Sequence, residues 1–431
     1  MKNRLLFAVA VNLSLVATAS AVKMSPSGIG EVFIVPYYTV QGGNNTLLSI
    51  TNVSTDVKAV KVRFLEAQNG KRVQAVNLYL PPSDVWTGNI QANGDGAMVV
   101  TNDASCSEPV IPASGLAFFP IAYANDGGDT GLGRTREGYV EIIEMGVVTD
   151  QKIIDAVTFD PATREPADCG VVASYWAEGG AWDDDPTYGM SGLTGGLMAE
   201  ANIINVNDGV EYSQTVTALE EFNDSPDSLH SGPRFGSPSL NSAAPATTTE
   251  PNDTWVKPED ALSGLLMSES LYTVYTVNPA VDATTEWNVT FPTKRFYTGI
   301  DGDKKPFTSS FGPDGACETV GIQYWNRETH TAAESLPLDL CYAANIVRVI
   351  RDGGASAIFQ PEWSGVDFIL TGADYPNGWA EIDFVTLAAD AETPPTVDDY
   401  VDHIMESAGG SIYAGLPAVG FSASRLGNKN V

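Results

Sequence analysis

The chain has 431 residues, enough for two or three domains at about 100–200 residues each. Its 54 Asp and Glu against 23 Lys and Arg give a formal net charge of −31. A surface this acidic repels phosphate backbones and anionic lipid headgroups, so nucleic acid and membrane surfaces are not expected partners.

The first 21 residues have the three parts of a secretory signal peptide. Lys2 and Arg4 form a positive head, residues 5–17 a mostly apolar run, and Ala19-Ser20-Ala21 a small-residue cleavage site. The apolar run falls short of the ~20 residues that span a bilayer. We therefore expect cleavage after Ala21 and an exported protein, periplasmic, cell-surface or extracellular, without a transmembrane anchor.

Residues 22–108 predict an N-terminal β-sandwich domain. Strands are expected at residues 32–35, 46–51, 57–65 and 73–80. In the third of these, apolar residues alternate with Lys61 and Arg63, the period-2 pattern of a sheet with one face in water. Asn69-Gly70, between two such runs, is a strong hairpin signal.

Residues 109–224 are richer in Gly and Asp and predict a second β domain or an insertion, with one clear strand at 138–143. Residues 210–222 fit either a helix or a strand, because their propensities conflict. Residues 225–258 are rich in Ser, Pro, Asn and Thr and predict an exposed loop or linker.

Residues 259–431 predict a C-terminal β-rich domain. Strands are expected at residues 271–277, 287–291, 345–350, 357–359, 380–387 and 418–422. A short helix is expected at 397–407, after Pro394 and Pro395. The recurrence of short strands and turns favours a mainly β fold of antiparallel, immunoglobulin-like β-sandwich domains with long loops and few short helices.

The four cysteines are expected to form disulfides, because an even cysteine count is typical of exported proteins. They are Cys106, Cys169, Cys317 and Cys341. None lies in a zinc, haem or redox spacing. We favour the pairing Cys106–Cys169 with Cys317–Cys341, which keeps each bridge inside one half of the chain; a long-range pairing stays open.

No catalytic signature stands out. The three histidines, His230, His330 and His403, lie apart from any triad or metal-cage pattern. Residues 189–192 break the spacing of a nucleophile elbow, and no Walker lysine occurs. A protein without enzymatic activity is the favoured hypothesis, and the alternative is a secreted polysaccharide hydrolase that uses paired carboxylates.

Two acidic turns offer the oxygen ligands that calcium prefers. They contain Asp183, Asp184 and Asp185 in one case and Asp301 and Asp303 in the other. Neither completes an EF-hand loop. They are candidates for a structural calcium ion, with plain solvated turns as the alternative, and no other cofactor is expected.

Trp182 and Trp379 are candidate sugar-stacking residues, because the C–H faces of sugars pack on aromatic rings. Core packing is the alternative for both tryptophans. Lys294 and Arg295 form a basic cluster in an acidic chain. They are candidates for ligand binding, or else they pair with surface carboxylates.

Several segments resemble a family of exported bacterial proteins that are described only as cell-surface proteins. The segments are residues 45–52, 60–65, 82–87, 201–206, 290–297 and 415–421. The resemblance spans most of the chain beyond the leader. It implies an exported β-rich protein and lends no activity and no functional residue.

These features favour a cell-surface or extracellular structural or adhesion-type protein that presents loops to a protein or glycan partner. A secreted carbohydrate-binding protein and the hydrolase above are the alternatives. Self-assembly is a third, in which residues 30–38 add as a strand to an open sheet edge.

Overall fold

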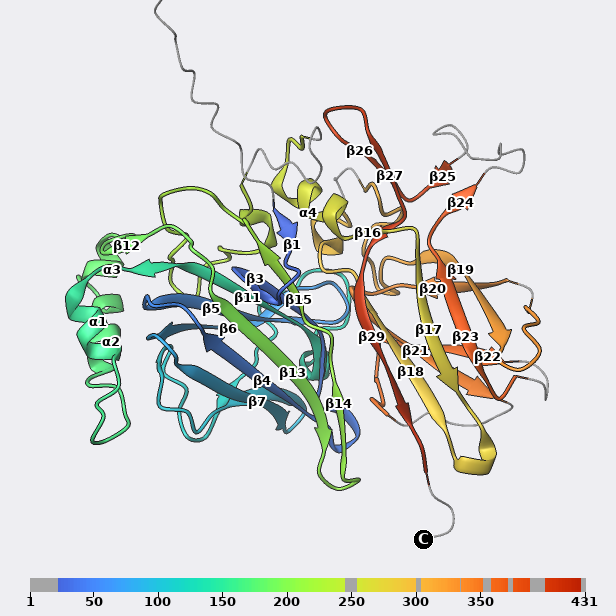
Figure 1. The fold of residues 1–431 in the computed structure, drawn as a ribbon, viewed down its shortest axis with the longest axis horizontal. Coiled ribbons are helices and arrows are strands. Elements are labelled where there is room, and N and C mark those ends of the chain that lie inside the picture. The colour runs from blue at the N-terminus through green and yellow to red at the C-terminus, as the bar shows by residue number, and fades with distance from the viewer. Residues whose placement is uncertain are drawn as a thin grey trace, which may run out of the picture.

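The computed structural model describes residues 22–244, 254–299, 304–333, 335–351, 358–370, 375–387 and 400–427. The predicted signal peptide lies outside these residues. The described chain is mainly β, with several antiparallel sheets, as expected. An N-terminal half, residues 22–244, and a C-terminal half, residues 254–427, lie side by side, coloured blue to green and yellow to red in Figure 1.

Two large sheets form the N-terminal half, and apolar side chains from both meet in one buried cluster. The first has the order β1-β15-β3-β11-β5-β6-β9, with β12 beside β11. Its strands are β1 (Lys23–Met24), β3 (Val32–Thr39), β5 (Lys58–Glu66), β6 (Arg72–Leu80), β9 (Cys106–Glu108), β11 (Glu137–Val148), β12 (Met190–Ser191) and β15 (Thr217–Glu220). The second has the order β10-β8-β7-β4-β13-β14, with β2 beside β13. Its strands are β2 (Ile29–Gly30), β4 (Asn45–Asn52), β7 (Val85–Asn93), β8 (Gly96–Val100), β10 (Leu116–Ala117), β13 (Leu197–Asn205) and β14 (Val210–Ser213).

The segment 109–224 shares these sheets with 22–108 and does not fold as a separate β domain. Strand β11 lies between β3 and β5, and β13 lies beside β4. Residues 210–222, for which helix and strand were both open, contain the strands β14 and β15. The shift in composition near residue 109 reflects the long loops, whereas the strands complete sheets begun earlier in the chain.

The predicted hairpin at Asn69-Gly70 is confirmed, since it joins the antiparallel strands β5 and β6. Gly70 has φ +62°, and a Cβ there would lie 2.6 Å from the Tyr139 hydroxyl. Residues 30–38 fall mostly in β3, which pairs with β15 on one side and β11 on the other. This segment is therefore not available as a donor strand for self-assembly.

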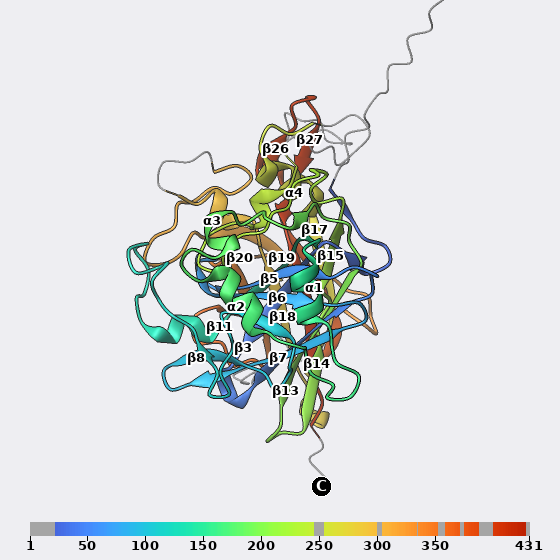
Figure 2. The ribbon, with the colours of Figure 1, turned by 90° about the vertical axis from the view of Figure 1, so that its left-hand side faces the viewer.

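The expected wet face of the first sheet is covered. Short helices pack on part of it: α1 (Gln151–Val157), α2 (Gly170–Trp176) and α3 (Ala181–Asp184). Figure 2 shows them in front of the strands. Residues 225–244 cover another part, because Lys61 Nζ donates to the carbonyls of Gly232 (2.9 Å) and Ser237 (2.6 Å). The described part of the predicted exposed loop, 225–258, is thus largely anchored, and residues 245–253 lie outside the described chain.

Two four-stranded sheets form most of the C-terminal half, and both contribute to one hydrophobic cluster. The first has the order β17-β23-β19-β20: β17 (Ser270–Thr276), β23 (Asn377–Asp383), β19 (Glu318–Asn326) and β20 (Leu336–Leu340). The second has the order β22-β21-β18-β29: β22 (Gly365–Leu370), β21 (Ala344–Arg351), β18 (Thr284–Thr290) and β29 (Val419–Arg425). Only the pair β21–β22 is parallel among these. Helix α4 (Pro258–Leu266) lies against the N-terminal half in a shared apolar cluster.

Short strand pairs complete this half. They are β16 (Met267–Ser268) with β28 (Leu416–Pro417), β24 (Thr386–Leu387) with β25 (Tyr400–Asp402), and β26 (Ile404–Glu406) with β27 (Ile412–Ala414). The helix expected at 397–407 is therefore wrong over its described residues. Pairing with other strands overrides the local helix propensity there.

The two halves are joined by hydrogen bonds and a common apolar cluster. The amide of Ala344 donates to the carbonyl of Ala67 at 2.9 Å, and the Thr290 hydroxyl donates to the Pro36 carbonyl at 2.7 Å. The cluster contains Tyr37 from one half and Phe359 from the other, with their rings edge to face. These contacts bury polar and apolar groups of both halves in one interface.

Candidate functional site

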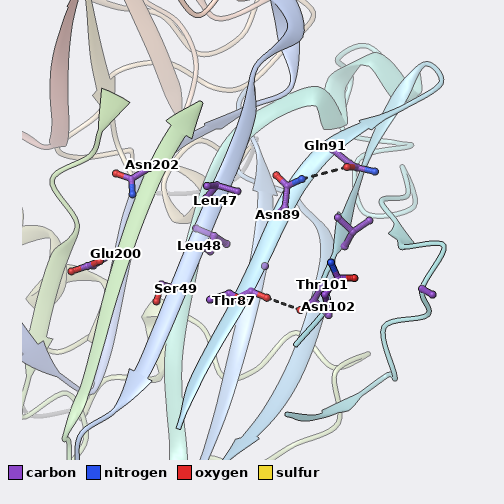
Figure 3. Close-up of a pocket in the computed structure, with 13 residues that line it drawn as sticks. Leu47, Leu48, Ser49, Thr87, Asn89, Gln91, Thr101, Asn102, Glu200 and Asn202 are labelled. Carbon is purple, nitrogen blue, oxygen red and sulfur yellow. Dashed lines mark hydrogen bonds between the residues drawn. The ribbon is translucent and has the colours of Figure 1, made fainter. Parts of the chain in front are cut away.

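A shallow groove of about 620 Å³ lies on the outer face of the second N-terminal sheet. It runs over strands β4, β7, β8 and β13 (Figure 3). Hydroxyl and amide side chains dominate its lining. The lining residues are Leu47, Leu48, Ser49, Thr87, Gly88, Asn89, Gln91, Val100, Thr101, Asn102, Ala113, Glu200 and Asn202. We call this site the amide groove.

Strand alternation and register bring the groove residues together. On β4, Leu48 and Ile50 are buried in the core, so Leu47 and Ser49 point outward. Leu47 lies opposite Asn89 of β7 on one side and opposite Asn202 of β13 on the other. Ser49 likewise lies between Thr87 and Glu200. The groove is therefore two rows of side chains that cross the sheet.

The core side of the groove floor is filled by Trp86. The indole is 1% exposed and folds beneath Gly88, where a Cβ would lie 2.2 Å from the ring. Any larger residue at position 88 would displace the indole, since aromatic core residues fill space at close to crystalline density. The glycine thus fixes the position of β7 over the core.

One buried side-chain oxygen in the groove has no hydrogen-bond partner among the described residues. Asn89 Nδ2 donates to Gln91 Oε1 at 3.3 Å, and Thr101 Oγ1 donates to the Thr87 carbonyl at 2.6 Å. Asn89 Oδ1 is buried and, within the described chain, accepts no hydrogen bond. An unsatisfied buried acceptor costs about 1–3 kcal/mol.

The two tryptophans that were predicted as candidate sugar-stacking residues differ in their exposure to solvent. Trp182 is fully buried, stacks on Tyr79 with centroids 5.2 Å apart and packs against His230. It therefore presents no ring face to a sugar. Trp379 is partly exposed on the outer face of the C-terminal sheet and stacks on Trp325. Of the two tryptophans, only Trp182 packs in the core.

Lys294 and Arg295 do not form a surface cluster. Lys294 is 2% exposed, and its ammonium donates to the Leu340 carbonyl at 3.1 Å. Burial lowers the pKa of Lys294 to about 7, against the opposing pull of Glu318. Arg295 forms a buried ion pair with Glu141. Lys294 is buried within the C-terminal half and Arg295 between the halves, so the expected pairing with surface carboxylates is wrong and neither side chain lies on the surface.

The acidic turn at 183–185 is used locally. Asp183 accepts a hydrogen bond from the Gly179 amide, and Asp185 accepts from the amide and hydroxyl of Thr187. Asp184 ends helix α3. Among the residues that the structure describes, no three His, Cys, Asp or Glu side chains group as metal ligands. Asp301 and Asp303 lie outside the described residues.

Both predicted disulfides are confirmed: Cys106 is bonded to Cys169 and Cys317 to Cys341. The amide groove was not predicted. Its signal in the sequence is polar residues at every second position, at 87, 89 and 91 and at 200 and 202. That pattern marks outward faces, but it does not show that β13 lies beside β4, some 150 residues earlier.

Comparisons with known proteins gave no match. No family model matches the chain, and searches of curated proteins and of solved structures found no significant similarity. In the described part of the chain, no helix has the length and apolar character needed to cross a membrane. The resemblance to exported cell-surface proteins remains a prediction.

Proposed function

We propose that this protein is an exported, adhesion-type binding protein of the cell surface or cell exterior, whose amide groove holds a neutral, hydroxyl-rich ligand such as an oligosaccharide. The hydroxyl and amide side chains that line the groove, Asn89 among them, carry this proposal. Amide and hydroxyl groups both donate and accept hydrogen bonds, as sugar hydroxyls do. A volume of about 620 Å³ is within the range of small-ligand sites, about 300–1,000 Å³.

The architecture suits such a role. We class each half as a β-sandwich of mainly antiparallel strands, the group to which immunoglobulin-like domains belong, because each pair of sheets shares one apolar cluster. Two disulfides are compatible with an oxidising, exported environment. A rigid sandwich that displays a polar sheet face is a common support for ligand binding.

The groove chemistry favours binding over hydrolysis. Glycosidases use two carboxyl groups about 5–9.5 Å apart, and Glu200 is the one carboxylate among the residues that line this groove. Amide groups neither donate nor remove protons at neutral pH. We therefore assign the groove a holding role.

A glycan microarray probed with the purified protein tests the proposal. We expect a small set of neutral oligosaccharides to bind the parent protein and to lose signal with Asn89→Ala. Binding confined to charged glycans, or retained fully by Asn89→Ala, would contradict the assignment of the groove.

One observation supports the hydrolase alternative. Ser105 Oγ lies 2.9 Å from Asp84 Oδ2 and 2.6 Å from Asp103 Oδ1, near the Thr87 end of the groove. Burial, with the nearby Asp103 charge, raises the pKa of Asp84 to about 6, within the range of a general acid. Hydrolysis of a polysaccharide by the parent protein but not by Asp84→Asn would establish this alternative.

A further inference from the structure

The outer face of the sheet β17-β23-β19-β20 carries a cluster of large apolar side chains. We call Tyr272, Val274, Trp325 and Trp379 the aromatic face. Val274 lies opposite Trp379, and Trp379 lies opposite Trp325. The two indoles stack with centroids 3.7 Å apart and planes within 4° of parallel. Tyr272 and Val274 are 63% and 72% exposed, so this cluster meets solvent.

Carboxylates adjoin the aromatic face. Glu381 is two residues beyond Trp379 on the same side of β23, and the Tyr272 hydroxyl donates to it at 2.7 Å. Asp383 follows two residues later. Its pKa is raised by burial and by the charges of Glu381 and Glu269. Negative charge is therefore crowded along this edge of the aromatic face.

No positive side chain balances these carboxylates within the described sheet face. The outward residues of its strands are Ser270, Tyr272, Val274, Thr276, Thr319, Gly321, Gln323, Trp325, Pro337, Asp339, Asn377, Trp379, Glu381 and Asp383. Arg327, just beyond β19, forms an ion pair with Glu328. The face thus combines aromatic rings with uncompensated negative charge.

We propose that the aromatic face docks an arginine-bearing segment of a partner protein. A guanidinium stacks its plane on an aromatic ring while its N–H groups bind a carboxylate. Trp379 and Glu381 offer these two contacts on one strand, and alternate residues of a strand are about 7 Å apart. A neutral sugar would stack on the rings but would leave the crowded carboxylates uncompensated, so charge complementarity favours the cation.

Titration of the intact protein with a short, end-blocked Gly/Ser peptide that carries two arginines tests this proposal. Tryptophan fluorescence and calorimetry report binding, and the same peptide with Gln in place of Arg is the ligand control. We expect the Arg peptide alone to bind, with an affinity that falls as salt rises. Trp379→Leu and Glu381→Gln should each weaken binding about five- to tenfold.

Two variants match these changes away from the aromatic face. Trp363→Leu removes a tryptophan that is 38% exposed, and Glu211→Gln neutralises an exposed carboxylate of β14; both should bind the peptide as the parent does. Equal weakening by Glu211→Gln would mean general attraction to an acidic protein and would overturn the proposal. Failure of the parent to bind the Arg peptide would also overturn the proposal. So would binding of a neutral sugar that is lost in Trp379→Leu. The amide groove lies in the other half, so its assignment stands or falls separately.

Discussion

Arg295 of the C-terminal half places its Nη1 atom 2.5 Å from the carboxylate of Glu141, on the central strand β11 of the N-terminal half. The hydrogens of Nη1 are donated to the Tyr139 hydroxyl and the Pro292 carbonyl. Arg63 also pairs with Glu141. A buried carboxylate thus receives one cation from each half, which ties the halves together electrostatically.

Replacing Arg295 by Met should lower the free energy of unfolding by about 3–5 kcal/mol, because it leaves Glu141 with only part of its compensating charge. Urea denaturation measures the change. Arg327→Met is the control, since Arg327 and Glu328 are 68% and 52% exposed and such a pair contributes less than about 1 kcal/mol. Equal effects of the two substitutions would contradict the role given to the buried pair.

Acid should destabilise the protein through His230. The ring Nδ1 lies 2.6 Å from the Pro186 carbonyl and Nε2 lies 2.9 Å from the Tyr79 hydroxyl, so a neutral ring satisfies both partners. Burial lowers the pKa of His230 to about 4. An unfolded histidine has a pKa of ~6.5. Between that pH and about 4, the unfolded chain therefore binds a proton at His230 that the folded chain does not. The free energy of unfolding falls as pH falls through this range, by about 3 kcal/mol in total.

The variant His230→Gln tests this pH effect. Relative to the parent, the variant should lose much less stability between pH 6.5 and 4 in urea denaturation. Comparison with the parent is needed because burial raises the pKa of Glu31 to about 7, which makes stability rise as pH falls toward 4.5. The exposed His330→Gln variant should keep the parent slope; an unchanged slope in His230→Gln would count against the buried neutral histidine.

The two disulfides should differ in their contribution to stability. Cys106–Cys169 closes a separation of 63 residues and Cys317–Cys341 one of 24. On loop entropy alone, replacing each cysteine pair by alanines should cost about 4 and about 3 kcal/mol, respectively. Thermal and urea denaturation of the two double variants measure this order. Peptide mapping without reduction that found free thiols or crossed bridges would contradict the pairing.

The mature protein should begin at Val22. Its side chain is fully buried in an apolar cluster with Leu219, and Lys23 and Met24 pair with β15. Trimming past Val22 would remove buried apolar surface, whereas cleavage after Ala21 would spare it. Amino-terminal sequencing of exported protein should read Val22 first; a retained Met1 would contradict the predicted signal peptide.

Local patterns in the sequence predicted where the strands lie, but not which segments pack against them. Alternation located β5, and Asn69-Gly70 located its hairpin. Alternation did not reveal that Lys61 and Arg63 are buried, because the covering residues come from distant segments.

The same limit explains the errors at the candidate sites. Trp182 and Arg295 looked like surface candidates by residue type, but their environments are made by contacts with residues far along the chain, such as Tyr79 and Glu141. The amide groove depends likewise on the placement of β13 beside β4. Residue type fixes the chemistry available, whereas tertiary pairing decides which residues meet solvent.

Isothermal titration of the best array-positive neutral oligosaccharide tests the central claim most directly. Asn89→Ala should weaken binding about tenfold, as expected for loss of one or two ligand hydrogen bonds. Asn93→Ala makes the same change at an exposed residue of β7 outside the lining of the groove and should leave the dissociation constant unchanged. Equal affinities for the parent and Asn89→Ala, or equal losses in both variants, would contradict the assignment of the amide groove as the ligand site.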